Sequence, residues 1–223
     1  MKKNPVVRIT PPELSTCLEP IRNEIELNVL LDWARAEELD IEGKHFKDLN
    51  LTEIDFSQLS FRNSIFENCS FIHCNFEKID FRDLRLQSCN LSNSDFTDGF
   101  FNRCEFVLGK LIGVDFHQAL LQNILFTDTN LQYGNFSKAT IKEIKIDECD
   151  LSHTTISECK LSKIVFDRVN LKTASFFKTP LKGLDFTTSQ IDGISVSLEA
   201  LNGAIVSSFQ AAELAKLLGL IVR

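Results

Sequence analysis

The chain has 223 residues, a formal net charge of −7 at pH 7 and 43% hydrophobic residues. This length suits a single domain, and no apolar stretch approaches the roughly 20 residues that a membrane-spanning helix needs, which excludes proteins built on such helices. Because no long apolar run follows Met1, Lys2 and Lys3, we expect no secretory signal, a cytoplasmic location and no membrane contact.

Residues 1–36 form the first region, and they lack the regular spacing of the residues that follow. Four prolines interrupt regular structure there: Pro5, Pro11, Pro12 and Pro20. The apolar residues of 24–36 are amphipathic enough for a short helix, but they also alternate as in a strand, so the sequence leaves both forms open. In either form we expect residues 1–36 to be an N-terminal extension that caps the first coil of the next region.

The second region is defined by a period of five. From Ile41 to Leu201 every fifth residue is apolar, without an insertion or deletion, and 16 of the 19 Phe lie in this register. A helix cannot place such residues on one face, because each step of five turns about 140° around its axis. A flat strand cannot either, because five is odd. The chain must turn after each short extended segment, which predicts an all-β parallel solenoid.

The apolar column also indicates how many segments make one coil. The sets that begin at Phe46 and Phe56 and continue in steps of 20 each have Phe at 6 of 8 positions, whereas the other two sets are rich in Leu and Ile. This establishes an alternation every ten residues and suggests coils of four segments. We predict an interior stack of aromatic rings formed by Phe56, Phe76, Phe96, Phe116, Phe136, Phe176, Phe46, Phe66, Phe106, Phe126, Phe166 and Phe186.

Six of the seven cysteines lie two residues before an apolar column position, where small side chains would fill the corners of a narrow interior. Free cysteine behaves there as a small buried hydrophobe. Cys69, His73 and Cys74 do not converge as a metal site, because His73 occupies an outward position. Cys69 and Cys89 would lie near disulfide distance, but a cytosolic setting argues against that bond. We expect no metal and no cofactor.

The repeat resembles that of a known family. The segments Ser94-Asp95-Phe96, Gly134-Asn135-Phe136 and Asn170-Leu171 are similar to the A(D/N)Lxx motif of pentapeptide-repeat proteins. The resemblance implies a right-handed quadrilateral parallel β-helix with four pentapeptides per coil. Residues 37–206 would then form about eight coils, roughly 40 Å long at the spacing of β-strands.

Residues 207–223 form the last region. Ser207 and Gln210 have the spacing of a capping box, residues 209–218 are typical of a helix, and Gly219 is a C-terminal stop. We expect a small apolar strand over 220–222. The apolar load exceeds what one coil end can hide, which predicts a two-fold dimer. Its interface residues would be Phe209, Leu214, Leu217, Leu218, Leu220 and Val222.

This ending resembles the C-terminal signature of Qnr-type and MfpA-type proteins in Gly203, Gln210-Ala211, Leu214 and Leu218-Gly219-Leu220. The resemblance implies a homodimer that binds type II topoisomerases, DNA gyrase and topoisomerase IV, by imitating duplex DNA. Such a protein would make no direct contact with nucleic acid. Some members of the family protect the enzyme from fluoroquinolones. Many Qnr-type proteins carry loops that interrupt the column. This chain has none between Ile41 and Leu201, which leaves either a loop-free relative or a protein with another task.

The lack of a recognisable catalytic site predicts a non-enzymatic protein, and the charges alone would equally suit an ordinary solvated surface. The four histidines are scattered, and we find no nucleophile or phosphate-binding loop beside them. Residues 1–100 carry 18 acids and 11 bases, whereas residues 101–223 carry 13 of each. Acidic residues gather on two sides of the predicted coil and are candidates for a partner-binding face. They are Asp55, Glu77, Asp95, Asp98 and Asp115 on the Phe56 side, and Glu105, Asp128, Asp147 and Glu148 on the Phe46 side.

An alternative function is a structural or adaptor rod with no topoisomerase partner. Four apolar residues at outward positions, Phe100, Leu108, Ile112 and Phe177, would mark its contact surface. A continuous acidic stripe would favour DNA mimicry, whereas a continuous apolar patch would favour the adaptor.

Overall fold

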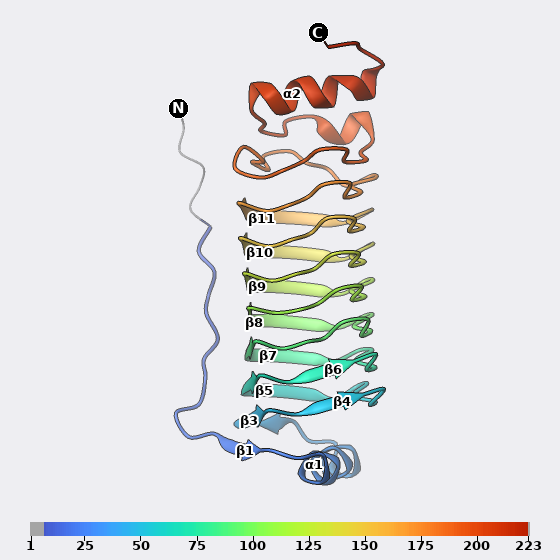
Figure 1. The fold of residues 1–223 in the computed structure, drawn as a ribbon. Coiled ribbons are helices and arrows are strands. Elements are labelled where there is room, and N and C mark those ends of the chain that lie inside the picture. Colours follow the sequence, from blue (N-terminus) through green and yellow to red (C-terminus); the bar gives the residue numbers. More distant parts are fainter. Residues whose placement is uncertain (1–6, 223) are drawn as a thin grey trace.

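The computed structural model describes residues 7–222 as a column of stacked coils with a helix at each end (Figure 1). The helices are α1 (Glu24–Glu37), α2 (Ser208–Ala215) and the short 3-10 helices η1 (Leu198–Leu201) and η2 (Lys216–Leu218). The strands are β1 (Glu19–Ile21), β2 (Ile41–Glu42), β3 (Lys44–Lys47), β4 (Asn50–Thr52), β5 (Ser60–Glu67), β6 (Ser70–Ile72), β7 (Asp80–Gln87), β8 (Phe100–Val107), β9 (Leu120–Thr127), β10 (Thr140–Asp147) and β11 (Lys160–Asp167).

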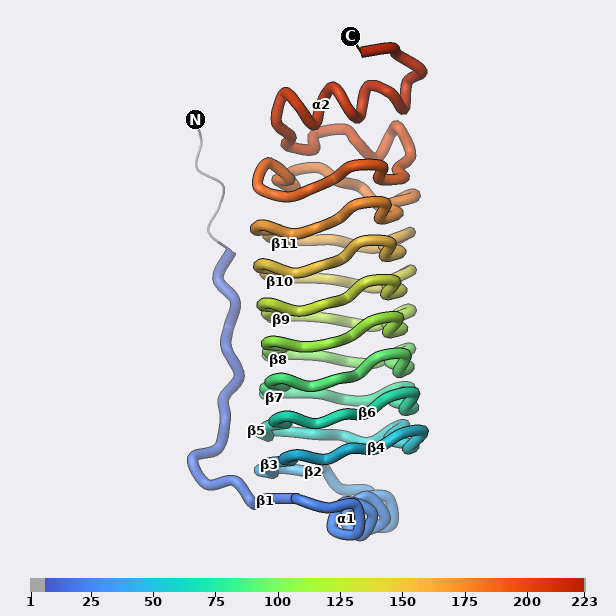
Figure 2. Tube along the Cα trace, viewed as in Figure 1, coloured from blue at the N-terminus to red at the C-terminus, as the bar shows by residue number. Residues whose placement is uncertain are grey.

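The strand pairing confirms a coil of 20 residues. All ladders between coils are parallel and join residues 20 apart, such as Ser60 with Asp80 and Phe101 with Leu121. The long sheet runs in the order β1-β3-β5-β7-β8-β9-β10-β11. Residues 41–200 thus make about eight coils of a right-handed solenoid, each of four pentapeptides (Figure 2).

The four faces of a coil are not built alike. Two adjoining faces, which we call the strand side, carry the eight-residue strands β5 and β7 to β11. The other two faces, which we call the turn side, consist of turns joined mostly by single bridges such as Asp55 with Asn75. Extended backbone on one side and turns on the other let every inward residue point at the same axis.

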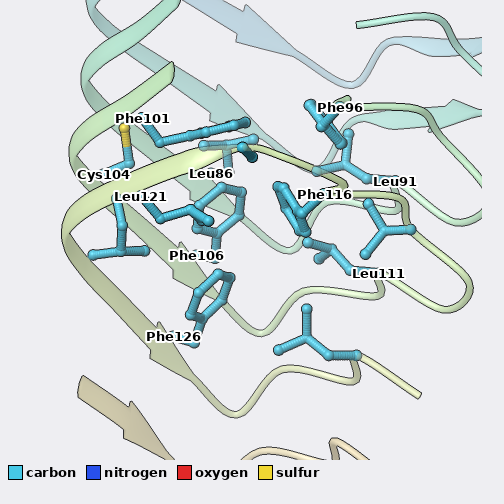
Figure 3. Packing of buried hydrophobic residues seen from close by; sticks show 14 of the residues in the cluster. Leu86, Leu91, Phe96, Phe101, Cys104, Phe106, Leu111, Phe116, Leu121 and Phe126 are labelled. Carbon is cyan, nitrogen blue, oxygen red and sulfur yellow. The ribbon is translucent and has the colours of Figure 1, made fainter. Parts of the chain in front are cut away.

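The predicted aromatic stack fills the interior, and all twelve of its Phe are buried. Rings in neighbouring coils lie face to face, with centroids 4.6 Å apart for Phe56 and Phe76 and 5.1 Å apart for Phe116 and Phe136. Figure 3 shows Phe106 and Phe126 one above the other beside leucines of the adjoining faces. Burying each such ring stabilises the fold by about 1.5–3 kcal/mol, so the stack is the main source of cohesion between coils.

A second column consists of residues in the left-handed conformation. From Asp48 to Lys178 every fifth residue has a positive φ, and Gly113 is the only glycine among them. Such a conformation is costly for most side chains but less so for Asn and Asp. At most of these positions the backbone N–H donates to a carbonyl of the next coil, as from Asn68 to the Gln87 oxygen at 2.9 Å. The hydrogen bonds between coils therefore compensate for the unfavourable backbone.

At the N-terminal end, residues 24–36 are helical, which resolves the two forms that the sequence left open. The side chain of Asn23 caps α1 by accepting the N–H of Glu26 at 2.9 Å. Leu27, Leu31 and Ala34 are buried against the first coil. The segment forms a helix and not a strand because these three residues, spaced by four and three, lie on one face of a helix and form one apolar stripe.

Residues 7–18 do not cap the first coil, as we expected of residues 1–36 as a whole. They run along the strand side as an extended segment, here called the strap (Figures 1 and 2). The Glu13 N–H donates to Asp83 Oδ1 at 2.9 Å, and the Thr10 N–H donates to Asn123 Oδ1 at 3.3 Å. The strap thus spans several coils, whereas the first coil is covered by α1 and by β1, which pairs with β3. Residues 1–6 lie outside the described part.

At the C-terminal end, the predicted capping box of Ser207 and Gln210 is confirmed. The buried Gln210 amide also donates to the carbonyls of Phe186 and Ser189, each at 2.8 Å, which satisfies backbone groups of the last coil. Gly219 ends the helical segment with a φ of 77°. The expected strand over 220–222 is wrong, because those residues have no partner strand in the described chain.

Candidate protein-binding surfaces

The acidic residues on the Phe56 face form a column on the turn side. Asp55, Asp95 and Asp115 share it with Asn75 and Asn135, one per coil, joined by parallel bridges. Each side-chain oxygen accepts the backbone N–H two residues ahead, as Asp95 Oδ1 does from Thr97 at 2.8 Å. These carboxylates hold the turns, and Asn75 and Asn135 perform the same task in the same column.

Only part of this column keeps an unneutralised charge. Asp55 faces Arg35 of α1 at 3.7 Å; burial alone would raise the pKa of Asp55, but the Ser57 hydrogen bonds and the Arg35 charge lower it overall. Glu77 pairs with Lys78 at 2.6 Å. Among the described residues Asp95, Asp98 and Asp115 have no ion-pair partner, and we call these three the free acidic cluster.

The acidic residues on the Phe46 face are mostly paired. Glu105 binds Arg85 at 2.8 Å, and the guanidinium of Arg168 reaches both Asp147 and Glu148 at 2.7 Å. In the described chain, Asp128 is the predicted member of this group without an ion pair. Because this face lies half a coil from the Phe56 face, the two acidic groups are on opposite sides of the column. The structure does not join them into one surface.

The predicted dimer residues are largely exposed in the single chain. Phe209 is 75% exposed, and Leu217, Leu218, Leu220 and Val222 are exposed as well, whereas Leu214 packs partly against the core. A cluster of exposed apolar side chains at the end of a rod is typical of a protein contact.

A comparable group at the other end was missed in the sequence. The outer face of α1 exposes Ile25 (78%), Val29 (65%) and Trp33 (46%), which follow one another at four-residue intervals. In the sequence this group is recognisable as a second apolar stripe of the helix, beside the stripe that faces the first coil. It was hidden because the choice between helix and strand was open.

The four residues proposed for an adaptor contact do not come together. Leu108 and Phe177 are exposed but lie on different sides of the column. Phe100 is half-buried beneath the guanidinium of Arg82, 4.6 Å from its ring centre, and Ile112 is half-buried. They form no continuous patch.

Within residues 7–222, no group of three His, Cys, Asp or Glu side chains is placed to hold a metal ion. All seven cysteines are free thiols. Burial raises the pKa of the Cys104 thiol to about 12, as expected for a cysteine that fills a corner of the core. None of the described helices has the length and apolar character needed to cross a membrane.

Comparisons with known proteins agree with this geometry. Residues 59–136 and 83–156 match the family model described as "Pentapeptide repeat region". No curated protein sequence matches the chain significantly. Among solved structures, full-length QnrB1, described as a plasmid-mediated fluoroquinolone resistance protein, is 22% identical with a TM-score of 0.50, covering 82% of this chain and 94% of that one.

A trypsin-treated form of QnrB1 is 21% identical with a TM-score of 0.50, over 93% of this chain and 98% of that one. HetL, a pentapeptide-repeat protein involved in heterocyst differentiation regulation in the cyanobacterium Nostoc sp. strain PCC 7120, is 17% identical with a TM-score of 0.61, over 82% of this chain and 92% of that one. At these identities the likeness establishes the fold alone.

Proposed function

The chain is a pentapeptide-repeat protein similar in fold to QnrB1, and on that premise we propose that it is a non-enzymatic, cytoplasmic homodimer that binds DNA gyrase or topoisomerase IV in place of DNA. Protection of that enzyme from fluoroquinolones would follow from the same contact. The observation that carries the proposal is the free acidic cluster on a straight rod, together with the Qnr-like C-terminal sequence.

The charge supports mimicry of a short stretch of duplex. Asp95 and Asp115 lie one coil apart, about 4.8 Å along the axis, and Asp98 lies beside them on the same face. Duplex DNA carries one charge per ~1.7 Å of its axis, so the cluster reproduces a few phosphates at reduced density. The rod would imitate mainly the shape of DNA, with the cluster fixing where the enzyme contacts it.

Two-fold pairing through the C-terminal end would lengthen the rod. Phe209 and Leu218 offer the exposed apolar area, and Gln210 fixes their helix on the last coil. Each protomer spans roughly 40 Å over its eight coils, so two joined end to end would make a rod of roughly twice that length.

Binding is tested with purified gyrase and topoisomerase IV subunits on a biosensor surface. The triple variant Asp95→Asn, Asp98→Asn, Asp115→Asn removes the charge but keeps the turns, since Asn75 and Asn135 already serve there. We expect about tenfold weaker binding from three exposed charges. The matched control, Glu105→Gln, Asp128→Asn, Glu148→Gln on the opposite side, should bind normally. Equal loss in both variants would show that net charge, not the cluster, is recognised.

The functional readout is DNA supercoiling by gyrase with and without ciprofloxacin. Inhibition of supercoiling or relief of the drug effect at micromolar protein is expected. If the protein neither binds nor affects either enzyme, the proposal is wrong.

The dimer is tested by sedimentation of Phe209→Glu with Leu218→Glu, which should be monomeric. Ile25→Glu is the control, since it places the same charge on an exposed apolar residue at the other end. If the double variant stays dimeric, the C-terminal end is not the interface.

One observation favours an adaptor as the second candidate. The apolar stripe of Ile25, Val29 and Trp33 on α1 faces solvent at the end away from α2. A rod with an apolar group at each end is suited to linking two proteins. Failure of all topoisomerase assays would leave this function.

A further inference from the structure

The sheet on the strand side has one break. Each pair of successive strands from β5 to β11 forms a ladder, but no ladder joins β11 to residues 180–187 in the described chain. On the turn side the coils stay joined across the same level, through bridges such as Asn170 with Gln190. The column is therefore continuous, but its strand side opens between two coils.

Pro180 is the cause. In the coils below, the residue at this position donates its backbone N–H to the carbonyl 21 residues earlier, as Thr140 does to Ala119 at 2.9 Å and Lys160 to Ala139 at 3.0 Å. Proline has no N–H, so the carbonyl of Cys159 loses its donor. At the far end of the strand, the Arg168 N–H turns to the Thr188 hydroxyl at 3.4 Å instead of a backbone carbonyl.

Within residues 7–222, the break leaves backbone N–H groups without acceptors on the edge of β11 that faces the following coil. One coil later, the N–H groups of Leu181 and Gly183 donate upward to Ala200 and Gly203, at 2.9 and 2.8 Å. The equivalent groups of β11 are those of Leu161 and Lys163, and no acceptor above them is present in the described chain. An unpaired strand edge of this kind is a template for another strand.

A groove of about 930 Å³ opens along this edge. Leu161, Ile164, Phe166 and Leu184 form its apolar lining, and Arg8 of the strap lies at its rim. Leu161 is half-buried, although Leu121 at the same register position is buried. Part of the interior is thus accessible from outside at this groove.

The charges at the groove indicate what it binds. Of its charged residues, Lys163 is paired with Glu143 at 2.7 Å and Asp167 with Arg168 at 3.2 Å, and Asp185 lies on the side of the following coil. Arg8 and Lys182 have no ion-pair partner among the described residues. A strand edge offering N–H donors, an apolar floor and two unpaired cations is suited to an extended peptide that carries a carboxylate.

We propose that this groove binds an acidic, extended segment of a partner protein as an additional strand along β11. The segment accepts hydrogen bonds from the Leu161 and Lys163 N–H groups and donates to the Cys159 carbonyl. An apolar side chain of the segment lies on the half-exposed Leu161, at the end of the groove away from the stacked rings of Phe166 and Phe186, and its carboxylate lies beside Lys182. This surface is separate from the free acidic cluster, which is on the turn side.

The first test is amide hydrogen exchange by NMR on the full chain. The Leu161 and Lys163 amides should exchange at least tenfold faster than those of Ile141 and Glu143, which occupy the same positions one coil earlier. The probe is an acetylated and amidated octapeptide of alternating valine and threonine with one central glutamate. At millimolar concentration it should slow exchange at Leu161 and Lys163 and shift the Lys182 resonances.

Two variants test the assignment. Pro180→Thr restores the donor that Thr140 provides below, so it should close the ladder and abolish peptide binding. Lys182→Gln should lower the affinity for the glutamate peptide about three- to fivefold, which is the effect of one exposed charge pair. The variant should then bind the glutamate peptide no more tightly than the unmodified chain binds a peptide with glutamine in place of glutamate. The control Lys172→Gln removes an exposed lysine from the turn side and should change nothing.

Four results would overturn the proposal. The first is strong protection of the Leu161 and Lys163 amides in the free protein, and the second is no change in their exchange on addition of the peptide. The third is unaltered peptide binding by Pro180→Thr. The fourth is peptide binding that appears only when residues 1–6 are deleted, which would make the chain's own N-terminus the occupant. Slower exchange that depends on protein concentration without peptide would make a second copy the occupant.

Discussion

The coils from β5 to β11 and the coil that follows them contain the same five-residue pattern, yet only the first set forms a continuous ladder on the strand side. Ring stacking shows the same difference. The centroids of Phe106 and Phe126 lie 4.8 Å apart, whereas those of Phe166 and Phe186, across the break, lie 5.5 Å apart. The inward residues alone therefore set the path of the chain, but the backbone ladder sets how closely coils approach.

This difference separates two sources of stability in a solenoid. Such folds are approximately a sum of contributions from neighbouring coils. Between regular coils, each interface combines buried apolar side chains, stacked rings in many of them, with a ladder of backbone hydrogen bonds. Between β11 and residues 180–187, the rings and the turn-side bridges remain, and the strand-side bonds are lost. Substitutions on the two sides of the break should therefore differ in cost.

The largest effect is expected from Phe116→Ala in the regular coils. Phe116 is completely buried and stacks on Phe96 and Phe136. Removing its ring leaves a cavity that the close ladder cannot collapse, so we expect a loss of about 3–5 kcal/mol in the free energy of unfolding. Urea denaturation followed by circular dichroism measures it. A loss well below 1 kcal/mol would mean that the stack does not hold the coils together.

A matched pair tests the break itself. Leu121 and Leu161 occupy the same register position two coils apart, but Leu121 is buried and Leu161 lines the groove. Leu121→Ala should cost about 2–4 kcal/mol, the range for a buried leucine. Leu161→Ala should cost roughly 1 kcal/mol, since little new cavity forms where solvent already enters. Equal losses in urea denaturation would show that the groove is closed in solution.

The strap connects the two regions, because it is fastened at Asp83 in the regular coils and reaches the groove at Arg8. Burial alone would raise the pKa of Asp83, but the Arg103 guanidinium and the Glu13 N–H lower it overall. A carboxyl with a lowered pKa in the folded state stabilises the protein above its ordinary pKa of about 3.9, and this stabilisation is lost as the pH falls below that value.

We therefore expect the Glu13 amide to lose about tenfold in its exchange protection factor between pH 5 and pH 2, because the lowered pKa of Asp83 shifts its proton uptake below the ordinary range. Asp83→Asn should show low protection at both pH values and cost about 1–2 kcal/mol, the contribution of a charged hydrogen bond. Asp98→Asn removes an exposed carboxylate that makes no contact with the strap and should keep the wild-type pH response. A pH-independent protection factor in the unmodified chain would contradict the role of Asp83.

The solenoid could be predicted because one physical constraint, inward apolar residues every five positions, repeats over eight coils and fits neither a helix nor a flat strand, whereas the hand and the four-segment coil were implied by the family resemblance. The twenty-residue coil also determines which charges meet. Arg85 with Glu105, and Glu143 with Lys163, are pairs 20 residues apart. Once coil length is known, such neutralisation can be read from the sequence, and it would have separated Asp95 and Asp115, which have no basic residue 20 positions away, from the paired acids.

Other features could not be predicted because they depend on single contacts. The strap has no periodicity, and it is held by individual side-chain atoms of Asp83 and Asn123. The break had a readable signal, since Pro180 is the only proline between residues 41 and 201. Its effect, however, depends on which N–H groups point to the neighbouring coil, and that requires the ladder itself.

The smallest effect is expected at Leu108, where the intact ladder holds a leucine in a left-handed backbone conformation. Leu108 is 56% exposed and has a φ of 54°, a conformation that suits leucine poorly, yet its N–H donates to the Thr127 carbonyl at 3.0 Å. Asn68 occupies the same column two coils earlier with a φ of 53°. Leu108→Asn should therefore raise the free energy of unfolding by roughly 0.5 kcal/mol, because Asn adopts this conformation more easily.

The control for Leu108 is Leu120, which is also exposed but lies within β9, where the backbone is extended. Leu120→Asn should lower stability by a few tenths of a kcal/mol, because Asn is disfavoured in strands. Urea denaturation of both variants decides between two causes. If both substitutions change stability in the same direction, exposed apolar area and not backbone conformation governs these positions. Opposite signs would show that the ladder of the regular coils holds Leu108 in an unfavourable conformation.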